Sequence, residues 1–380
     1  MAATVLLFGF NLYRTVTHQN GILIDFALYS KIIEYMKMSG TITTPHFIYP
    51  LLVLVASEIF PGRTYTVLGA CIVLLFQLLL AHVLWRFWKH VLLNRWSDFV
   101  TVVLTLMCMT IAPVNLLTLS EQNGYFGYIG ITIYHNPPIL LCRPIALLNF
   151  IVFAAAVANQ KISTRQIILC FITMALATLM KPNYALIIIP TAIIFASMAI
   201  GQKDFRLLRF ISLGTLLPGF LILAGQFLFT YISPTSYMEQ SHIIFAPFLV
   251  YERMSDYLFP KFILSVLFPL SVLVVFWKQV IRDRYYMIGL LLFIVGAVQS
   301  YFLAESGVRM YYGNFIWSAQ LGLFLWFIVS MRVVLQRLLS DSNFARWSPA
   351  LIAVYLCFAL HVASGIVWYV DETIGPGSFW

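Results

Sequence analysis

Apolar segments recur along the whole chain, and this periodic pattern limits the folds that are open to it. Eleven segments are candidates for membrane-spanning helices, since a helix needs about 20 apolar residues to cross the hydrocarbon layer. They cover residues 2–15, 65–88, 98–118, 138–158, 165–180, 183–200, 208–232, 260–277, 285–303, 314–334 and 348–370. The first falls several residues short of a full crossing. The sequence therefore predicts an all-α, polytopic membrane protein with about eleven transmembrane helices.

The composition excludes a soluble domain. Hydrophobic residues make up 61% of the chain and charged residues 10%, whereas charged residues make up about a quarter of an ordinary soluble domain. In a soluble protein, the formal net charge of +9 would suggest nucleic acid as a partner. Here most basic side chains lie in the connections between apolar segments. We therefore expect them to contact anionic membrane lipids, and we expect no nucleic acid.

The basic residues gather on one side of the predicted membrane. Fourteen of the 23 lie in the connections after even-numbered segments, namely Arg86, Lys89, Arg95, Lys161, Arg165, Lys203, Arg206, Arg209, Lys278, Arg282, Arg284, Arg332, Arg337 and Arg346. Positive charge marks the cytoplasmic side, which puts the N-terminus in the cytoplasm and the other connections outside. We expect a multi-pass protein of a bacterial inner membrane or a plasma membrane. The opening segment lacks signal-peptide features and is expected to remain as the first span.

No internal repeat or linker divides the chain, so residues 1–380 are expected to form a single integral membrane domain. Outer-face loops are predicted at residues 16–64, 119–137, 233–259 and 304–313. In the first loop, apolar and charged residues alternate at helical spacing over residues 25–38, which predicts an amphipathic helix in the membrane interface. The apolar run at residues 46–60 is too short to span and favours a re-entrant or interfacial helix.

Several kinds of chemistry find no support in the sequence. The five cysteines lie within apolar runs without metal-ligand spacing, so neither a zinc site nor a disulfide framework is expected. Walker, dinucleotide-binding and zinc-protease motifs do not occur. An outward-facing transferase without a nucleotide site would most simply use a donor already activated in the membrane, such as a polyprenyl-phosphate sugar. No metal site is predicted, although a divalent cation is left open as a cofactor.

Charged side chains near the outer membrane surface are costly to place and are commonly functional. Asp25 lies shortly after the first segment, where a carboxylate could take a proton from an acceptor hydroxyl during sugar transfer. It could equally cap an interfacial helix that starts near Phe26, because Asp is a favoured N-cap residue. The position of Asp25 in the sequence supports both interpretations.

A second polar group surrounds the start of the segment at residues 138–158. His135 and Asn136 precede Pro137 and Pro138, which are typical of a helix start, so the two polar residues either bind a ligand or simply begin the helix. Arg143 lies roughly a turn and a half further on, inside an otherwise apolar helix. A buried guanidinium needs an anionic partner, and we expect a phosphate or pyrophosphate of the outer leaflet.

Two further groups lie in short outer connections. The Lys-Pro-Asn run at residues 181–183 predicts a tight hairpin, in which Lys181 is either structural or binds a lipid phosphate. Glu305, Arg309 and Asn314 lie close together in the sequence beside two tyrosines. In the simpler interpretation Glu305 and Arg309 form an ion pair. Carboxylate, guanidinium and aromatic groups together also bind the hydroxyls and the apolar face of a sugar.

Taken together, the sidedness and the motifs resemble the GT-C superfamily of polytopic glycosyltransferases. The resemblance covers most of the chain in topology, from a first span with a cytoplasmic N-terminus to an outer loop with an acidic residue and interfacial helices. In detail it depends on four short motifs, Asp25-Phe26-Ala27-Leu28-Tyr29, Tyr49-Pro50, His135-Asn136-Pro137 and Lys181-Pro182-Asn183. The sequence departs from many members by lacking a paired acidic motif near Asp25 and a large soluble C-terminal domain, which leaves metal dependence open.

The resemblance implies an inverting hexosyltransferase that moves a sugar from a polyprenyl-phosphate donor to a lipid or glycan acceptor on the extracytoplasmic face, in cell-envelope glycan or glycolipid biosynthesis. Asp25 would be the general base, and Lys181, Arg143 or Arg309 would bind the donor phosphate. The remaining members of the site would be His135, Asn136, Glu305, Tyr29 and Asn314. A polysaccharide polymerase or ligase that uses a lipid-pyrophosphate glycan is one alternative. A solute transporter or lipid flippase is another, although the sequence lacks the repeated halves typical of transporters.

Overall fold

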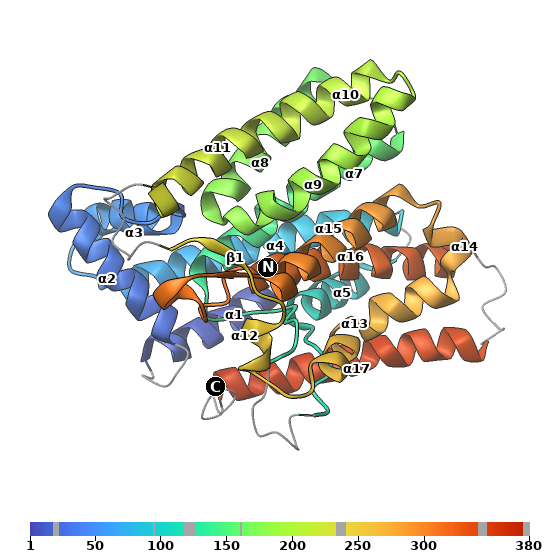
Figure 1. The fold of residues 1–380 in the computed structure, drawn as a ribbon. Helices are drawn as coiled ribbons and strands as arrows, with labels where there is room; N and C mark the ends of the chain where they lie inside the picture. The colour runs from blue at the N-terminus through green and yellow to red at the C-terminus, as the bar shows by residue number, and fades with distance from the viewer. Residues whose placement is uncertain are drawn as a thin grey trace.

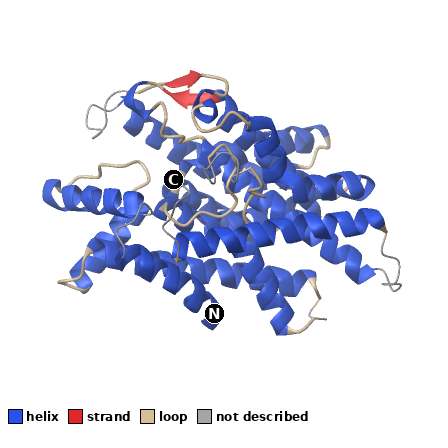
Figure 2. Cartoon of the chain, turned by 90° about the horizontal axis from the view of Figure 1, so that it is seen from below, coloured by secondary structure: helices blue, strands red, loops and turns tan. Residues whose placement is uncertain are grey.

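The computed structural model is a bundle of long helices with a small two-stranded ribbon at one edge (Figures 1 and 2). It describes residues 1–17, 23–93, 96–117, 126–159, 162–232, 241–340 and 348–374. In chain order the elements are α1 (Ala2–Thr17), α2 (Leu23–Ser39), α3 (Ile48–Ile59), α4 (Tyr65–Val91), α5 (Asp98–Thr110), α7 (Pro137–Asn159), α8 (Thr164–Met180), α9 (Pro182–Gly201), α10 (Phe205–Ile211), η1 (Ser212–Leu216), α11 (Leu217–Phe227), η2 (Leu228–Ile232), β1 (Ile243–Phe245), α12 (Leu249–Glu252), α13 (Leu258–Val275), α14 (Trp277–Val280), α15 (Arg284–Phe302), β2 (Leu303–Glu305), η3 (Gly307–Arg309), α16 (Ile316–Ser340) and α17 (Pro349–Thr373). Of these, η1 and η2 are π-helical turns and η3 is a 3-10 turn.

Within the described residues, eight helical segments are long and apolar enough to cross a membrane. They are α4, α7, α9, the continuous segment from α10 to η2, α13, α15, α16 and α17. The predicted segments at residues 98–118 and 165–180 correspond to the shorter helices α5 and α8, and residues 2–15 correspond to α1. The prediction of a helical, polytopic membrane protein is confirmed, while the number of about eleven crossings stays a prediction.

Several helices begin where the sequence carries a local start signal. Side-chain oxygens accept a hydrogen bond from a backbone N–H of the first turn at Thr64, Ser97, Ser163, Asp204, Asp283 and Ser348. At Ser163 the cap is reciprocal, because the Gln166 side chain also accepts from the Ser163 backbone. These caps satisfy amide groups that no helical carbonyl can reach, so the helix starts are determined locally.

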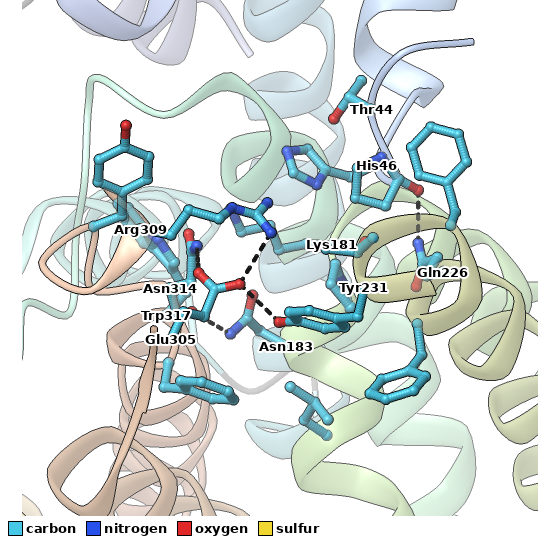
Figure 3. A pocket seen from close by; sticks show the side chains of 18 of the residues that line it. Thr44, His46, Lys181, Asn183, Gln226, Tyr231, Glu305, Arg309, Asn314 and Trp317 are labelled. Carbon is cyan, nitrogen blue, oxygen red and sulfur yellow. Dashed lines mark hydrogen bonds and ion pairs between the residues drawn. The ribbon is translucent and has the colours of Figure 1, made fainter. Parts of the chain in front are cut away.

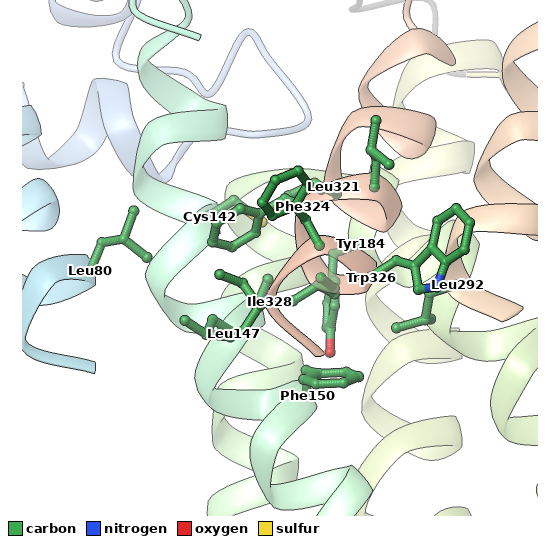
Figure 4. Packing of buried hydrophobic residues seen from close by; sticks show 14 of the residues in the cluster. Leu80, Cys142, Leu147, Phe150, Tyr184, Leu292, Leu321, Phe324, Trp326 and Ile328 are labelled. Carbon is green, nitrogen blue, oxygen red and sulfur yellow. The ribbon is translucent and has the colours of Figure 1, made fainter. Parts of the chain in front are cut away.

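The centre of the bundle is formed by α7, α9 and α16. In its most apolar stretch, 89% of the α16 residues and 78% of the α7 residues are buried, against 22% for α17. Figure 4 shows Leu147 and Phe150 of α7 packed near Tyr184 of α9 and Phe324 of α16. A helix that is apolar and buried all round belongs to the core of a bundle. Helix α17 lies at the periphery, where its outward apolar side chains are available to lipid.

Helices α15 and α16 pack with their backbones in close contact because glycines lie at their crossing. A Cβ atom on Gly296 would lie 2.5 Å from the carbonyl oxygen of Ser318, and one on Gly322 would lie 2.7 Å from the carbonyl oxygen of Leu292. Lipid tails are as apolar as the helix surfaces, so close packing of this kind is a main source of helix association in a membrane.

We expect Gly296→Ala to destabilise the protein by about 1–3 kcal/mol, because the added methyl group must push the two helix backbones apart. Thermal unfolding of the detergent-solubilised protein measures the effect. Gly225→Ala is the matched control, since nothing lies within 4 Å of a Cβ atom at Gly225 of α11. A loss of equal size in both variants would contradict close α15–α16 packing as the cause.

The predicted amphipathic helix is present as α2. It buries Phe26, Tyr29, Ile33 and Met36, and it exposes Lys31 on its other face. The expected alternation of apolar and charged faces is therefore confirmed. The run at residues 46–60 forms α3, which has 12 residues and is too short to span, as its sequence predicts.

The two-stranded ribbon was not predicted. Strand β1 pairs antiparallel with β2, with Ile243 opposite Glu305, inside what were expected to be the loops 233–259 and 304–313. Three-residue strands are too short to show an alternating pattern in the sequence. Residues 233–240 of the first of these loops, 118–125 and 18–22 lie outside the described residues.

The basic residues of α10 and α14 and the helices α2 and α3, which are predicted to face outside, lie at opposite ends of the bundle. In Figure 1, α10 and α14, which carry Arg206, Arg209 and Lys278, lie at the right-hand end. The helices α2 and α3 lie at the left-hand end. The basic side chains of these two helices therefore lie far from the helices predicted to face outside.

Candidate active site

A cavity of about 580 Å³ lies between α2, the residues before α3, the α8–α9 junction, η2 and the ribbon. The polar groups that line it come from segments far apart in the sequence, and Figure 3 shows many of them. They include Asp25, Tyr29, Thr44, His46, Asn136, Lys181, Asn183, Gln226, Tyr231, Glu305, Arg309, Tyr312 and Asn314. Apolar side chains of α2, α9, α11 and η2 form much of the remaining wall.

The cavity brings together most of the residues that the sequence singled out. Seven of these nine residues line it, namely Asp25, Tyr29, Asn136, Lys181, Glu305, Arg309 and Asn314. The other two, His135 and Arg143, do not line it. Conversely, the sequence did not mark His46, Gln226 and Tyr231 as members of the site, and it gave Asn183 only as part of the hairpin.

Asp25 lies in the first turn of α2 and is only partly buried. Its Oδ2 accepts a hydrogen bond of 2.7 Å from Nδ2 of Asn136. The Oδ1 of Asn136 accepts from the backbone N–H of Ile139 at 3.2 Å, so Asn136 caps α7 and holds Asp25 at once. Helix α2 begins at Leu23 and not near Phe26, so Asp25 is not its N-cap. In the described part of the chain, Oδ1 of Asp25 has no hydrogen-bond partner and remains free to accept a proton.

Lys181 joins α8 to α9 in an extended conformation, with φ −155° and ψ 115°. Pro182 imposes this conformation, because a residue before proline is excluded from the helical region. The Nζ atom lies 5.1 Å from the centre of the Trp317 ring, and no carboxylate among the described residues forms an ion pair with it. Burial lowers the pKa of Lys181 to about 8, since desolvation favours the neutral amine. The cavity thus contains a buried cation that forms no ion pair with a described carboxylate, although Asp25 and Glu305 are near enough for their charges to act on it.

The hairpin that carries Lys181 is tied to α16. Nδ2 of Asn183 donates to the carbonyl oxygen of Asn314 at 2.7 Å and to Oγ of Ser318 at 3.0 Å. The amide therefore holds the α8–α9 junction against the residues that follow η3. The hydrogen bond from Asn183 to Asn314 therefore joins the two groups that the sequence predicted, at residues 181–183 and 305–314.

Glu305 is the most constrained charged group of the cavity. It is 4% exposed and lies 3.3 Å from Nη1 of Arg309, so the predicted ion pair forms and also faces the cavity. Oε1 of Glu305 also accepts from the Tyr231 hydroxyl at 2.7 Å, and Oε2 accepts from the side-chain amide of Asn314. Donors from three segments hold this carboxylate in one orientation, which leaves Asp25 as the carboxylate with a free oxygen.

His46 reaches the cavity from the loop before α3. Its Nε2 lies 2.8 Å from the hydroxyl oxygen of Tyr29, and the edge of the Tyr29 ring meets Tyr49, with centres 5.4 Å apart. Nε2 of Gln226 donates to the carbonyl oxygens of Pro45 and Thr178, both at 2.9 Å, and so fixes the loop next to His46. Nothing in the local sequence marked His46, because its partners lie on other segments.

Arg143 does not line the cavity although it lies only about a turn and a half into α7. Its guanidinium carbon lies 4.3 Å from the centre of the Phe324 ring, and Nε and Nη2 have no hydrogen-bond partner among the described residues. His135 lies with its ring 6.0 Å from that of Trp317. The role in phosphate binding expected for Arg143 therefore stays a prediction that the lining of the cavity does not support.

The charges of the cavity define its chemistry. Glu305 neutralises Arg309, and Asp25 is held by a neutral amide, so Lys181 is left to attract an anion and Asp25 to accept a proton. No cluster of three or more His, Cys, Asp or Glu side chains suited to a metal ion occurs within the described ranges. Comparison of the chain with protein-family models, with curated proteins and with solved structures finds no match.

Proposed function

We propose that this chain is a membrane glycosyltransferase that moves a sugar from a polyprenyl-phosphate donor to a lipid or glycan acceptor. The observation that carries the proposal is that one cavity holds a carboxylate with a free oxygen, Asp25, and a buried lysine that forms no ion pair with a described carboxylate, Lys181. Transfer from a phosphate-linked sugar needs a base for the acceptor and positive charge for the leaving phosphate. The resemblance of the sequence motifs to GT-C glycosyltransferases supports the same chemistry.

In the proposed reaction, the acceptor oxygen attacks the anomeric carbon of the donor sugar while Oδ1 of Asp25 takes the hydroxyl proton. The bond between the anomeric carbon and the phosphate oxygen breaks, and its electron pair stays on the lipid phosphate. Lys181 stabilises the added negative charge on that phosphate, and Arg309, whose charge Glu305 balances, adds hydrogen bonds to it. Attack from the side opposite the leaving group inverts the configuration of the sugar.

The remaining walls suit the other parts of the two substrates. Glu305, Asn314 and Tyr231 present oxygen and nitrogen atoms to sugar hydroxyls, and Trp317 offers a flat ring to the apolar face of a sugar. Apolar side chains such as Leu223 and Phe227 suit a lipid chain. Because the basic connections lie at the other end of the bundle, the proposed reaction takes place on the extracytoplasmic side.

A polymerase or ligase that uses a lipid-pyrophosphate glycan is the second candidate. A pyrophosphate carries more negative charge than a phosphodiester, whereas the cavity offers one cation, Lys181, that no carboxylate neutralises. This charge balance favours the phosphodiester donor. Transfer from a lipid-pyrophosphate oligosaccharide, and not from any lipid-phosphate sugar, would reverse the order of the two candidates.

The proposal is tested by incubating the purified chain in nanodiscs with a panel of radiolabelled polyprenyl-phosphate sugars and a membrane lipid extract. We expect one donor to give a labelled product that is absent when Asp25→Asn replaces the wild-type protein. Movement of unmodified donor or solute across liposomes without any labelled product would instead favour a transporter or flippase.

The affinity for the donor should depend on pH through Lys181. Its ammonium is charged below the pKa of about 8 and loses its charge above it. We therefore expect donor affinity to fall as the pH is raised from about 7 to about 9, and Lys181→Ala to weaken binding roughly 10- to 100-fold at neutral pH. In Lys181→Arg the charge persists, so the pH dependence should disappear. An unchanged pH profile in that variant would assign the titration to another group.

A further inference from the structure

His46 shares one part of the cavity with Lys181 and Arg309. The three side chains come from the loop before α3, the α8–α9 junction and η3, and Figure 3 shows them gathered round the same space. The two cations are close enough to His46 to act on its charge. Nitrogen donors from three segments that converge on one space are the arrangement that binds the several oxygens of a phosphoryl group.

The contact with Tyr29 indicates which ring nitrogen of His46 carries the proton. The Tyr29 hydroxyl is buried and has no other hydrogen-bond acceptor among the described residues, which favours donation of its proton to Nε2 of His46 across 2.8 Å. A neutral imidazole carries one proton, which then lies on Nδ1. Within the described residues Nδ1 has no hydrogen-bond partner. It is the nitrogen of His46 that remains available as a donor.

We propose that His46 completes an anion site with Lys181 and Arg309 by donating Nδ1–H to a phosphoryl oxygen, and that Tyr29 is the positioning residue that fixes this tautomer. The inference rests on the proposed function for the identity of the ligand as a lipid-linked phosphate. His46 would be a third donor to the phosphoryl group, beside Lys181 and Arg309. Tyr29 would then act by positioning His46 and not by binding the sugar.

A charge on the ligand should change the protonation of His46. Burial and the positive charges of Lys181 and Arg309 keep the pKa of His46 well below its ordinary value in the empty cavity. Tyr29 faces it from α2 as a neutral phenol, and the carboxylates of Asp25 and Glu305 line the same cavity. An anion placed between the three nitrogens offsets the two cations, so the pKa of His46 should rise.

The test is nuclear magnetic resonance of the full chain with labelled histidine, in phosphatidylcholine nanodiscs. The His46 signal is identified by its loss in His46→Ala. We expect Nδ1–H to be the main neutral tautomer, and the pKa of the ring to rise when farnesyl phosphate is added. Affinity for farnesyl phosphate should fall about tenfold in His46→Ala. Tyr29→Phe should give a mixture of tautomers and a smaller loss. His82→Ala, on the exposed face of α4, is the matched control and should bind as the wild type does.

The outcomes separate the inference from the proposed function. A response to farnesyl phosphate but not to inorganic phosphate supports a lipid-linked ligand, and an equal response to both supports recognition of the phosphoryl group alone. Normal affinity in His46→Ala with an unmoved ring pKa overturns the inference, even if sugar transfer that depends on Asp25 is found. If farnesyl phosphate moves His46 but no donor sugar is transferred, the anion site stands and the transferase proposal fails.

Discussion

Asp25→Asn is expected to lower the rate of sugar transfer by roughly 10²- to 10⁴-fold, the usual contribution of a general base. The substitution keeps the size of the side chain and an oxygen that can still accept the hydrogen bond from Asn136. It removes only the capacity to take a proton. Affinity for the donor should be unchanged, because Lys181 and Arg309 are untouched. Initial rates with a radiolabelled donor, together with donor binding, measure the two effects separately.

Glu34→Gln is the matched control for this prediction. Glu34 is a carboxylate on the same helix, α2, but it lies on the exposed face away from the buried residues. Its variant should transfer sugar at the wild-type rate. Wild-type turnover by Asp25→Asn would remove Asp25 from the mechanism, and equal losses in both variants would point to damage to α2 and not to the chemistry.

Glu305→Ala is expected to destabilise the protein by about 3–5 kcal/mol, the cost of leaving a buried ion-pair partner uncompensated. Arg309 is 9% exposed and would keep its charge without a counter-ion. The hydroxyl of Tyr231 and the amide of Asn314 would lose their acceptor in the same step. The unfolding midpoint of the detergent-solubilised protein should fall clearly, and it can be measured without a substrate.

Glu58→Ala is the control for Glu305→Ala, because it removes an exposed ion pair and not a buried one. Glu58 pairs with Lys37 at 2.8 Å, but the two side chains are 65% and 51% exposed. Exposed pairs contribute about 0–1 kcal/mol, so this variant should unfold close to the wild-type midpoint. If Glu305→Ala were no less stable than Glu58→Ala, Glu305 would not be the residue that holds the ribbon, η2 and η3 together.

The sequence predicted the membrane class, the positions of the helices and seven of the residues that line the cavity. Asp25, Lys181 and the pair of Glu305 and Arg309 stand out because charge is rare beside apolar segments, so each is visible without knowledge of its neighbours. The amphipathic pattern of α2 was visible for the same reason. These features depend on composition and spacing over a few turns.

The direction of Arg143 could not be predicted. Helix α7 is apolar and buried on nearly all sides, so its sequence has no polar face to show how it is rotated in the bundle. Packing against α16 places the guanidinium over Phe324, and Arg143 is not among the residues that line the cavity. The ribbon and His46 were missed for a related reason, because Ile243 meets Glu305 and His46 meets Tyr29 only after the chain has folded.

The sequence alone thus determined which segments are helical, which connections are basic and which charged residues are unusual, because burial in lipid and helix capping act over short stretches of chain. Only the tertiary structure decided which of those residues share a cavity. It assigned the cap of α7 to Asn136, left one oxygen of Asp25 free, paired Glu305 with Arg309 and left Lys181 unpaired. Helix rotation and long-range packing make these choices, and neither follows from local spacing.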